Sequence, residues 1–308
     1  MAGTFILSLD CEGKWGMADH LTADHHRWLT PTRLREAYQR LLHLLAEHRV
    51  EATFAFVMAF LLTDREQRDR NALFQDQPIG GRNWLHNFRV AQAEENMDGW
   101  TMPELLDVVA TDGAHEIGCH GFSHLPLAPT VVSREVMARE VAAASSVAAE
   151  KDLALRTFVY PRNLVGYPDQ LAREGYAGFR DRLPVRNGPV GQLGNLLSEF
   201  DVTQRPQPNA SGTGTPIAIP SGFFFNWRLG ARARVPRSIT VLRWRRMLER
   251  AARDGGVVHL WLHPHNIISA PGTFDVLREV IRDVARLRDG GRLEVRTQAR
   301  YCAERTPR

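Results

Sequence analysis

The chain has 308 residues, of which 44% are hydrophobic and 24% are charged, a composition typical of globular proteins that excludes the fibrous and disordered classes. The formal net charge of +4 is too small to indicate a nucleic-acid partner, although arginines gather between positions 228 and 250. We interpret that basic stretch as the solvated face of a helix, with a grip on a phosphate or diphosphate group as the alternative.

The first residues carry no basic leader and reach Asp10 after a short apolar run, which fits neither a secretory signal nor a membrane span. The three cysteines are too few for a disulfide framework, and free thiols fit a reducing compartment. We therefore expect a cytoplasmic protein that binds neither nucleic acid nor membrane. The oligomeric state is left open.

Short apolar runs alternate with amphipathic helical patterns, which predicts repeated βα units around a parallel sheet. Strands are predicted near residues 4–10, 52–57, 115–120, 156–160, 177–180, 215–219, 257–262 and 293–297. Helices are predicted over Arg33–His48, Pro103–Ala110, Ser133–Glu150, Pro168–Glu174, Ile239–Asp254 and Phe274–Arg288. The segments 64–99 and 184–214 are expected to be long irregular connections within a single domain that spans residues 1–308.

Polar side chains follow five of the predicted strands, each at the carboxyl end of its strand. The clusters are Asp10 with Glu12, His120, Pro161 with Arg162, Arg180 with Asp181, and His263. The carboxyl ends of parallel strands meet at one edge in α/β folds, and the loops beyond them are free to vary. We therefore expect the five clusters to form a single polar pocket.

His120 and His124 are four residues apart in the sequence His-Gly-Phe-Ser-His. On a helical turn or in a tight loop, this spacing presents two imidazole nitrogens on one side, where they can hold a divalent metal ion. An isolated pair of this kind is more often two ordinary polar residues. Alternation along the first strand, however, sends Asp10 and Glu12 to one side and Cys11 to the other. One carboxylate can then bind the metal while its neighbour takes a proton.

The ordered set of motifs resembles the polysaccharide deacetylase superfamily, carbohydrate esterase family 4, and in particular its intracellular branch. The resemblance runs from Phe5 to about Asn266 and includes the acidic pair, the H-x-x-x-H motif, an arginine and proline motif, and the strand that ends in Leu-Trp-Leu-His263. It implies an α/β fold, a distorted (β/α) barrel of about seven to eight strands. It also implies a divalent metal ion and hydrolysis of an N-acyl group on an amino sugar.

The acidic pair departs from the family pattern, because Cys11 separates the two acids and the second is glutamate instead of aspartate. The resemblance implies that Asp10 is the catalytic base and that Glu12 binds the metal with His120 and His124. The exchanged assignment of the two acids stays open. A salt bridge from either carboxylate to an arginine is the structural alternative.

His263 is the expected catalytic acid, because an imidazole at a strand end can donate a proton to the leaving amine; a capped core histidine is the alternative. Arg162 follows Pro161, whereas the family's arginine precedes the proline, and we expect it to orient the base or to grip substrate. For His265, stabilisation of its own loop is an equal alternative. Substrate contacts are expected from Tyr160, Arg162, Asn163, Arg180, Trp261 and His265.

These observations predict a metal-dependent hydrolase that removes an N-acyl group, in the first place N-acetyl, from a soluble amino sugar, a nucleotide sugar or a glycoside natural product. One divalent ion is expected per chain, with zinc as the first choice and cobalt, nickel or iron as alternatives. Hydrolysis of a non-sugar amide, imide or ureide is the second hypothesis. A non-catalytic carbohydrate-binding protein on the same scaffold is the third.

Overall fold

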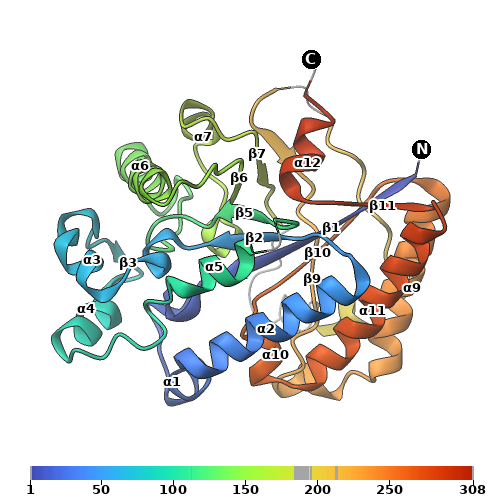
Figure 1. Cartoon of the computed structure of the whole chain (residues 1–308), viewed down its shortest axis with the longest axis horizontal. Helices are drawn as coiled ribbons and strands as arrows, with labels where there is room; N and C mark the ends of the chain where they lie inside the picture. The colour runs from blue at the N-terminus through green and yellow to red at the C-terminus, as the bar shows by residue number, and fades with distance from the viewer. Residues whose placement is uncertain (1, 112, 184–193, 195, 212–213, 307–308) are drawn as a thin grey trace.

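The computed structural model describes residues 2–306 except 112, 184–193, 195, 212 and 213 (Figure 1). Within these residues nine strands form one parallel sheet, and eight of them follow one another in the order β8-β7-β6-β5-β2-β1-β10-β9, while β11 pairs with β1. The strands are β1 (Gly3–Cys11), β2 (Thr53–Phe56), β5 (Glu116–Cys119), β6 (Thr157–Val159), β7 (Gly178–Arg180), β8 (Ile217–Ile219), β9 (Phe223–Phe224), β10 (Val257–Leu262) and β11 (Leu293–Arg296). The expected α/β fold, a distorted (β/α) barrel, is confirmed.

β1 is the centre of the sheet, and all nine of its residues are buried. Its second half pairs with β2 and its first half with β11, while β10 lies along its other side. A parallel strand that is covered on both faces must be apolar on both faces, which explains its nearly continuous run of hydrophobic residues. Asp10, close to the end of this strand, is consequently a buried carboxylate with 2% of its surface exposed.

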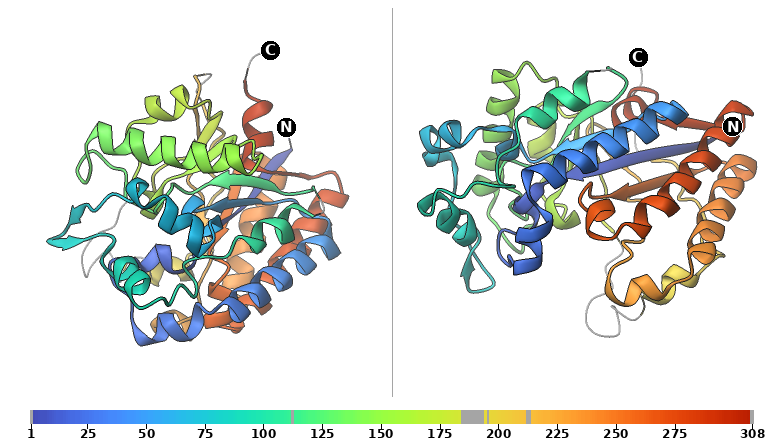
Figure 2. Two further views of the ribbon diagram at one scale, coloured as in Figure 1. Left: turned by 60° about the vertical axis from the view of Figure 1, so that its left-hand side comes forward. Right: turned by 60° about the horizontal axis from the view of Figure 1, so that its bottom comes forward.

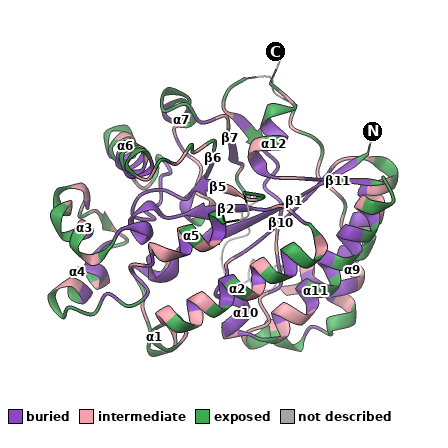
Figure 3. Cartoon of the chain, in the orientation of Figure 1, coloured by how far each residue is buried: buried purple, intermediate pink, exposed green. Residues whose placement is uncertain are grey.

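The helices pack around the curled sheet and turn their apolar faces inward (Figures 2 and 3). They are α1 (Ala23–Trp28), α2 (Pro31–His48), α5 (Glu104–Ala110), α6 (Arg134–Glu150), α7 (Pro168–Arg173), α9 (Arg237–Asp254), α10 (Asn266–Ser269), α11 (Gly272–Asp289) and α12 (Gln298–Ala303). The six helices predicted from periodicity are all present, with ends shifted by at most two residues. Among the described residues no helix is both long enough and apolar enough to cross a membrane.

Segment 64–99 contains regular structure, so the prediction of an irregular connection is wrong there. It forms α3 (Asp64–Asp69), the antiparallel hairpin β3 (Pro78–Ile79) with β4 (Arg82–Asn83), and α4 (His86–Ala93). A capping box between Thr63 and Glu66 begins α3, and apolar anchors such as Phe74 and Phe88 pack on Trp15. These elements are too short for a periodic pattern to reveal them. The segment 184–214 lies partly outside the described residues.

β8 and β9, the first and last strands in the order of the sheet, are joined by a short segment of the chain. β8 and β9 are separated in sequence by residues 220–222 alone. Side chains from other segments hold this connection, because Gln207 donates to Ser221 Oγ and accepts from the Gly222 amide, and His259 donates to the Pro220 carbonyl. Gly222 has a φ of 74°, and a Cβ atom there would lie 2.3 Å from the His259 carbonyl oxygen. We call residues 220–222 the barrel joint.

Candidate active site

The site lies at the carboxyl edge of the sheet, where the ends of β1, β5 and β10 meet. Glu12 directly follows β1, His120 follows β5, and His263 follows β10. These three residues line one cleft of about 310 Å³ together with Asp10 and His265. Polar residues from strands far apart in the sequence thus share one cleft.

Glu12, His120 and His124 bring one carboxylate oxygen and two imidazole nitrogens within 4.8 Å of one another. Glu12 Oε2 lies 2.9 Å from His124 Nε2 and 3.5 Å from His120 Nε2. His120 Nδ1 donates to the Val159 carbonyl at 2.8 Å, so its Nε2 is the nitrogen that faces the carboxylate. The histidines lie on a tight loop instead of a helix, because the chain turns with φ values of 81° at Gly121 and 58° at His124.

These side chains fit a divalent metal ion. None of the three is more than 4% exposed, and His124 Nδ1 has no hydrogen-bond partner within the described part of the chain. Burial lowers the pKa of His124, which keeps its imidazole neutral. Burial alone would raise the pKa of Glu12, but His263 and His124 bring it well below its ordinary value, so the carboxylate stays charged. One carboxylate with two neutral imidazoles is a common catalytic zinc ligand set that leaves a position for water.

Asp10 is held by Arg180, which is 1% exposed at the end of β7. The two terminal nitrogens of Arg180 donate to the two oxygens of Asp10 at 2.8 and 2.6 Å. The guanidinium also donates to Asn163 Oδ1 and lies 4.5 Å from the centre of the Trp261 ring. Burial alone would raise the pKa of Asp10, but the charges of Arg180 and His120 outweigh it and lower the pKa. The structure therefore places Arg180 behind the cleft, not in its lining.

Arg162 lies at the rim of the cleft and does not orient Asp10. Its Nη2 donates to Asp19 Oδ1 at 2.6 Å, and its guanidinium lies 4.6 Å from the centre of the Trp84 ring. Among the described residues, the arginine that pairs with Asp10 is Arg180 alone. The physical reason is local, because Arg162 has a φ of 55° in the turn after β6 and its side chain runs along the rim.

Tyr160 and Asn163 were also expected to contact substrate, and the structure places them in different environments. Tyr160 is fully buried, and its hydroxyl donates to the Gly166 carbonyl at 2.8 Å, which stabilises the loop after β6. Asn163 lines the cleft, and its amide oxygen accepts from Arg180. Of these two side chains, Asn163 is thus the one within reach of a bound molecule.

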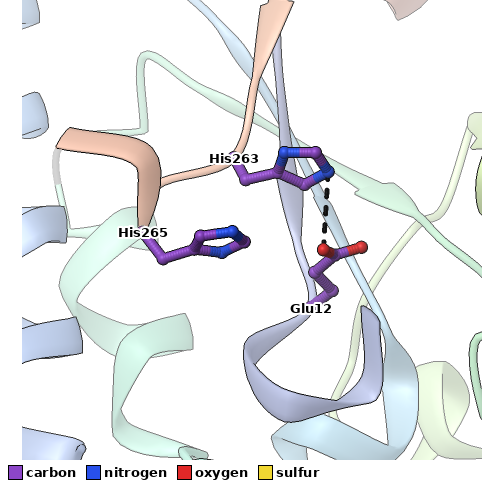
Figure 4. A group of neighbouring side chains, drawn as sticks. All are labelled: Glu12, His263 and His265. Atoms are coloured by element: carbon purple, nitrogen blue, oxygen red, sulfur yellow. Dashed lines mark ion pairs between the residues drawn. The ribbon is translucent and has the colours of Figure 1, made fainter. Parts of the chain in front are cut away.

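His263 faces the other oxygen of Glu12, with its Nε2 3.4 Å from Glu12 Oε1 (Figure 4). Its Nδ1 lies 3.3 Å from Asn266 Oδ1, which orients the ring. The His265 ring stacks on it with centroids 5.0 Å apart and planes inclined by 21°. Burial lowers the pKa of His265 to about 3, so its imidazole is neutral. Trp261 lines the same cleft beside His263.

The cleft is also lined by residues that the sequence analysis did not assign to it, among them His20, His25, Phe224 and Trp227. The two histidines follow the acidic pair in a polar segment, and that position was their only signal. Phe224 belongs to β9, which has two residues and is too short to show strand periodicity. Of the aromatic residues Phe224, Trp227 and Trp261 that line the cleft, the sequence analysis therefore assigned only Trp261.

Comparison with known proteins identifies the family behind this arrangement. Residues 20–174, half of the chain, match the family model for polysaccharide deacetylase, whereas no curated protein sequence matches. The crystal structure of a "putative polysaccharide deacetylase" from Mycobacterium smegmatis has a TM-score of 0.62 at 16% identity, over 98% of this chain and 90% of that one. That of a "probable Polysaccharide deacetylase" from Pseudomonas aeruginosa PAO1 has a TM-score of 0.58 at 13% identity, over 97% and 89%. The solved structures share the fold, and the family model shows that the chain belongs to the polysaccharide deacetylase family.

Proposed function

We propose that the protein is a metal-dependent deacetylase that hydrolyses the N-acyl group of a soluble amino sugar or of a glycoside that carries one. One observation carries the proposal. Three side chains that could hold a metal ion, a carboxylate held by a buried arginine, and a histidine that faces the other oxygen of Glu12 share one cleft. Hydrolysis of an amide needs an activated water, stabilisation of the oxyanion and an acid for the leaving amine, and these groups can supply all three.

Each residue of the chain has a separate task in this proposal. Glu12, His120 and His124 would hold the ion, with zinc as the first choice; when bound, it supplies Lewis-acid polarisation of the acyl oxygen and a lowered pKa of water. Asp10 stays ionised beside Arg180 and accepts the proton of the attacking water. His263, with its Nδ1 directed to Asn266, holds a proton on Nε2 and donates it to the departing nitrogen.

The walls of the cleft support a ring-shaped substrate. Phe224, Trp227 and Trp261 line it, and aromatic faces stack well on sugar rings. Arg162 adds a cation at the rim, where its partner Asp19 is a quarter exposed. A soluble sugar derivative, with or without an anionic group, matches this lining.

The test separates metal binding from chemistry. Asp10→Asn should retain the metal and lose turnover of an N-acetylated amino sugar by about 10²–10⁴-fold, because it removes a base and no ligand. Glu12→Gln should lose the metal. Metal content by elemental analysis and acetate release from a panel of N-acyl sugars and cyclic amides are the two measurements.

The matched control is Asp107→Asn, which changes an exposed carboxylate on α5 and should alter neither measurement. If Asp10→Asn empties the site and Glu12→Gln keeps it filled, the two acids exchange their roles. A wild-type protein that binds sugar and releases no acyl group from any amide would contradict the enzymatic function. Turnover of cyclic amides alone would contradict the sugar substrate.

A further inference from the structure

Glu12 lies between two pairs of histidines, and its two oxygens face different pairs. Oε2 contacts His120 and His124, whereas Oε1 lies 3.4 Å from His263 Nε2. Figure 4 shows His263 and His265 side by side, with His263 directed at the Glu12 carboxylate. Ligand atoms of Glu12, His263 and His265 all lie within 4.8 Å of one another, the same compactness as in the first group.

His265 has no task in the proposed reaction, and its environment is unusual for a polar side chain. It is 4% exposed, and within the described part of the chain neither of its ring nitrogens makes a hydrogen bond. Its ring contacts are the stack on His263 and an edge contact with Trp227, whose ring centroid is 6.2 Å away. The ring lines the cleft, so its unbonded nitrogens are available to a ligand there.

The His263 ring is oriented in the same way as a metal-binding histidine. Its Nδ1 lies 3.3 Å from Asn266 Oδ1, which leaves Nε2 facing Glu12. His120 shows the same arrangement, with Nδ1 bonded to the Val159 carbonyl and Nε2 facing Glu12. A hydrogen bond on the distal nitrogen is what fixes the ring of a histidine that binds a metal.

We propose that Glu12 Oε1, His263 and His265 form a second, weaker divalent-cation site beside the first, and that its occupation inhibits the enzyme. Inhibition follows from the proposed function, because the lone pair of His263 Nε2 would bind the ion and could no longer carry the proton for the leaving amine. The binding itself does not depend on that function. Two imidazoles and a carboxylate suit zinc or cobalt best.

The second site should be the weaker one for two reasons. Glu12 is shared, so its charge is already balanced when the first site is filled, and the two cations repel each other across the carboxylate. The His263 side chain is also 22% exposed, whereas that of His124 is 3% exposed, so water competes more strongly for the second ion. Filling should therefore proceed in two separate steps.

The experiment titrates metal-depleted protein with Zn²⁺ by calorimetry and measures bound zinc by elemental analysis after equilibrium dialysis. Wild type should bind about one ion tightly and about two at excess, the stoichiometry of a carboxylate-bridged pair. His265→Gln should stop at about one, and His43→Gln, a change on the exposed face of α2, should reach two. Activity of wild type at excess zinc should fall by roughly the 10²-fold typical of losing a general acid.

For each variant, the activity at one equivalent of zinc is divided by the activity of the same variant at excess zinc. This ratio should stay near unity for His265→Gln. His265→Asn gives the same comparison if the first variant does not fold. A wild type that binds a single ion at excess zinc overturns the second site. Two bound ions with undiminished activity overturn the inhibition. If the protein binds two ions and hydrolyses no amide, the proposed function fails while the site stands.

Discussion

Arg180 controls the carboxylate that we propose as the catalytic base, and it does so through a chain of buried contacts. Besides its two bonds to Asp10, its Nη1 donates to Ser8 Oγ at 3.2 Å. Ser8 Oγ lies 2.8 Å from His259 Nε2, and His259 Nδ1 donates to the Pro220 carbonyl at 2.7 Å. Because a carbonyl only accepts, this chain fixes the His259 tautomer and links three strands to the base.

Arg180→Met should leave the Asp10 carboxylate buried without its partner. Removing one member of a buried ion pair costs about 3–5 kcal/mol, so the free energy of unfolding in urea should fall by that order. Since Arg180 lowers the pKa of Asp10, its loss raises that pKa, and the acid limb of kcat/KM should move to higher pH. Arg180→Lys, which keeps the charge, should shift the limb less. An unmoved acid limb with retained metal would contradict the role of Arg180.

For single residues, the sequence predicted which strand ends carry the site better than it predicted which partner each side chain contacts. Glu12, His120 and His124 gather because they follow β1 and β5, which flank β2 and end at the same edge of the sheet. The partner of Asp10 could not be predicted in the same way. Arg162 and Arg180 both follow a strand, and the choice between them depends on the left-handed backbone at Arg162.

At the scale of elements, the contact between β1 and β10 contains a titratable group. His259 is fully buried opposite Ile6 in the register of the two strands, and burial with the nearby charge of Arg180 lowers its pKa to about 3. The charged form is therefore excluded from the folded sheet at neutral pH. Stability of this strand pair must then depend on pH.

The free energy of unfolding should decrease as the pH falls from about 6.5 towards 3. In that window the unfolded chain protonates His259 and the folded protein does not, so the unfolded state binds more protons and gains stability. Each unit of separation between the two pKa values is equivalent to about 1.4 kcal/mol. Urea unfolding at several pH values should show a smaller slope for His259→Gln than for His43→Gln. Equal slopes would show that another group causes the dependence.

The longer elements were predictable because their patterns repeat. β10 is a buried six-residue strand in which His259 is the one polar residue, and α2 carries Leu34, Leu41 and Leu45 on one face behind the N-cap Thr30. β9 and the hairpin of β3 and β4 have two residues in each strand, so no alternation exists to read. Their formation depends on tertiary contacts that periodicity does not report.

At the scale of the whole molecule, the candidate metal group ties together segments that lie far apart in the sequence. Glu12 follows β1, whereas His120 and His124 follow β5, and β2 separates the two strands in the sheet. An ion bound by all three would therefore hold neighbouring parts of the barrel against each other. A ligand that binds the folded state alone at 100 times its Kd adds about 2.7 kcal/mol of stability.

Removal of divalent ions with a chelator should lower the melting temperature of the wild-type protein. His120→Ala should melt at the same temperature with and without chelator, because the first site is then lost. His43→Ala should behave as the wild type does. The measurement is thermal unfolding at one equivalent of zinc. A wild-type melting temperature that the chelator does not change would rule out a metal bound to the folded protein.

The place of β1 in the sheet has a consequence for how the protein is made. β1 leaves the ribosome before every strand that it pairs with, and β10 and β11 follow it by about 250 and 290 residues. β2 can pair with the second half of β1 early, but the first half must wait for almost the whole chain to be synthesised before its neighbours β10 and β11 exist. Pairings this distant form slowly, so the nascent chain exposes an apolar strand during most of its synthesis. A chaperone that covers the strand until β10 is made would shorten that exposure.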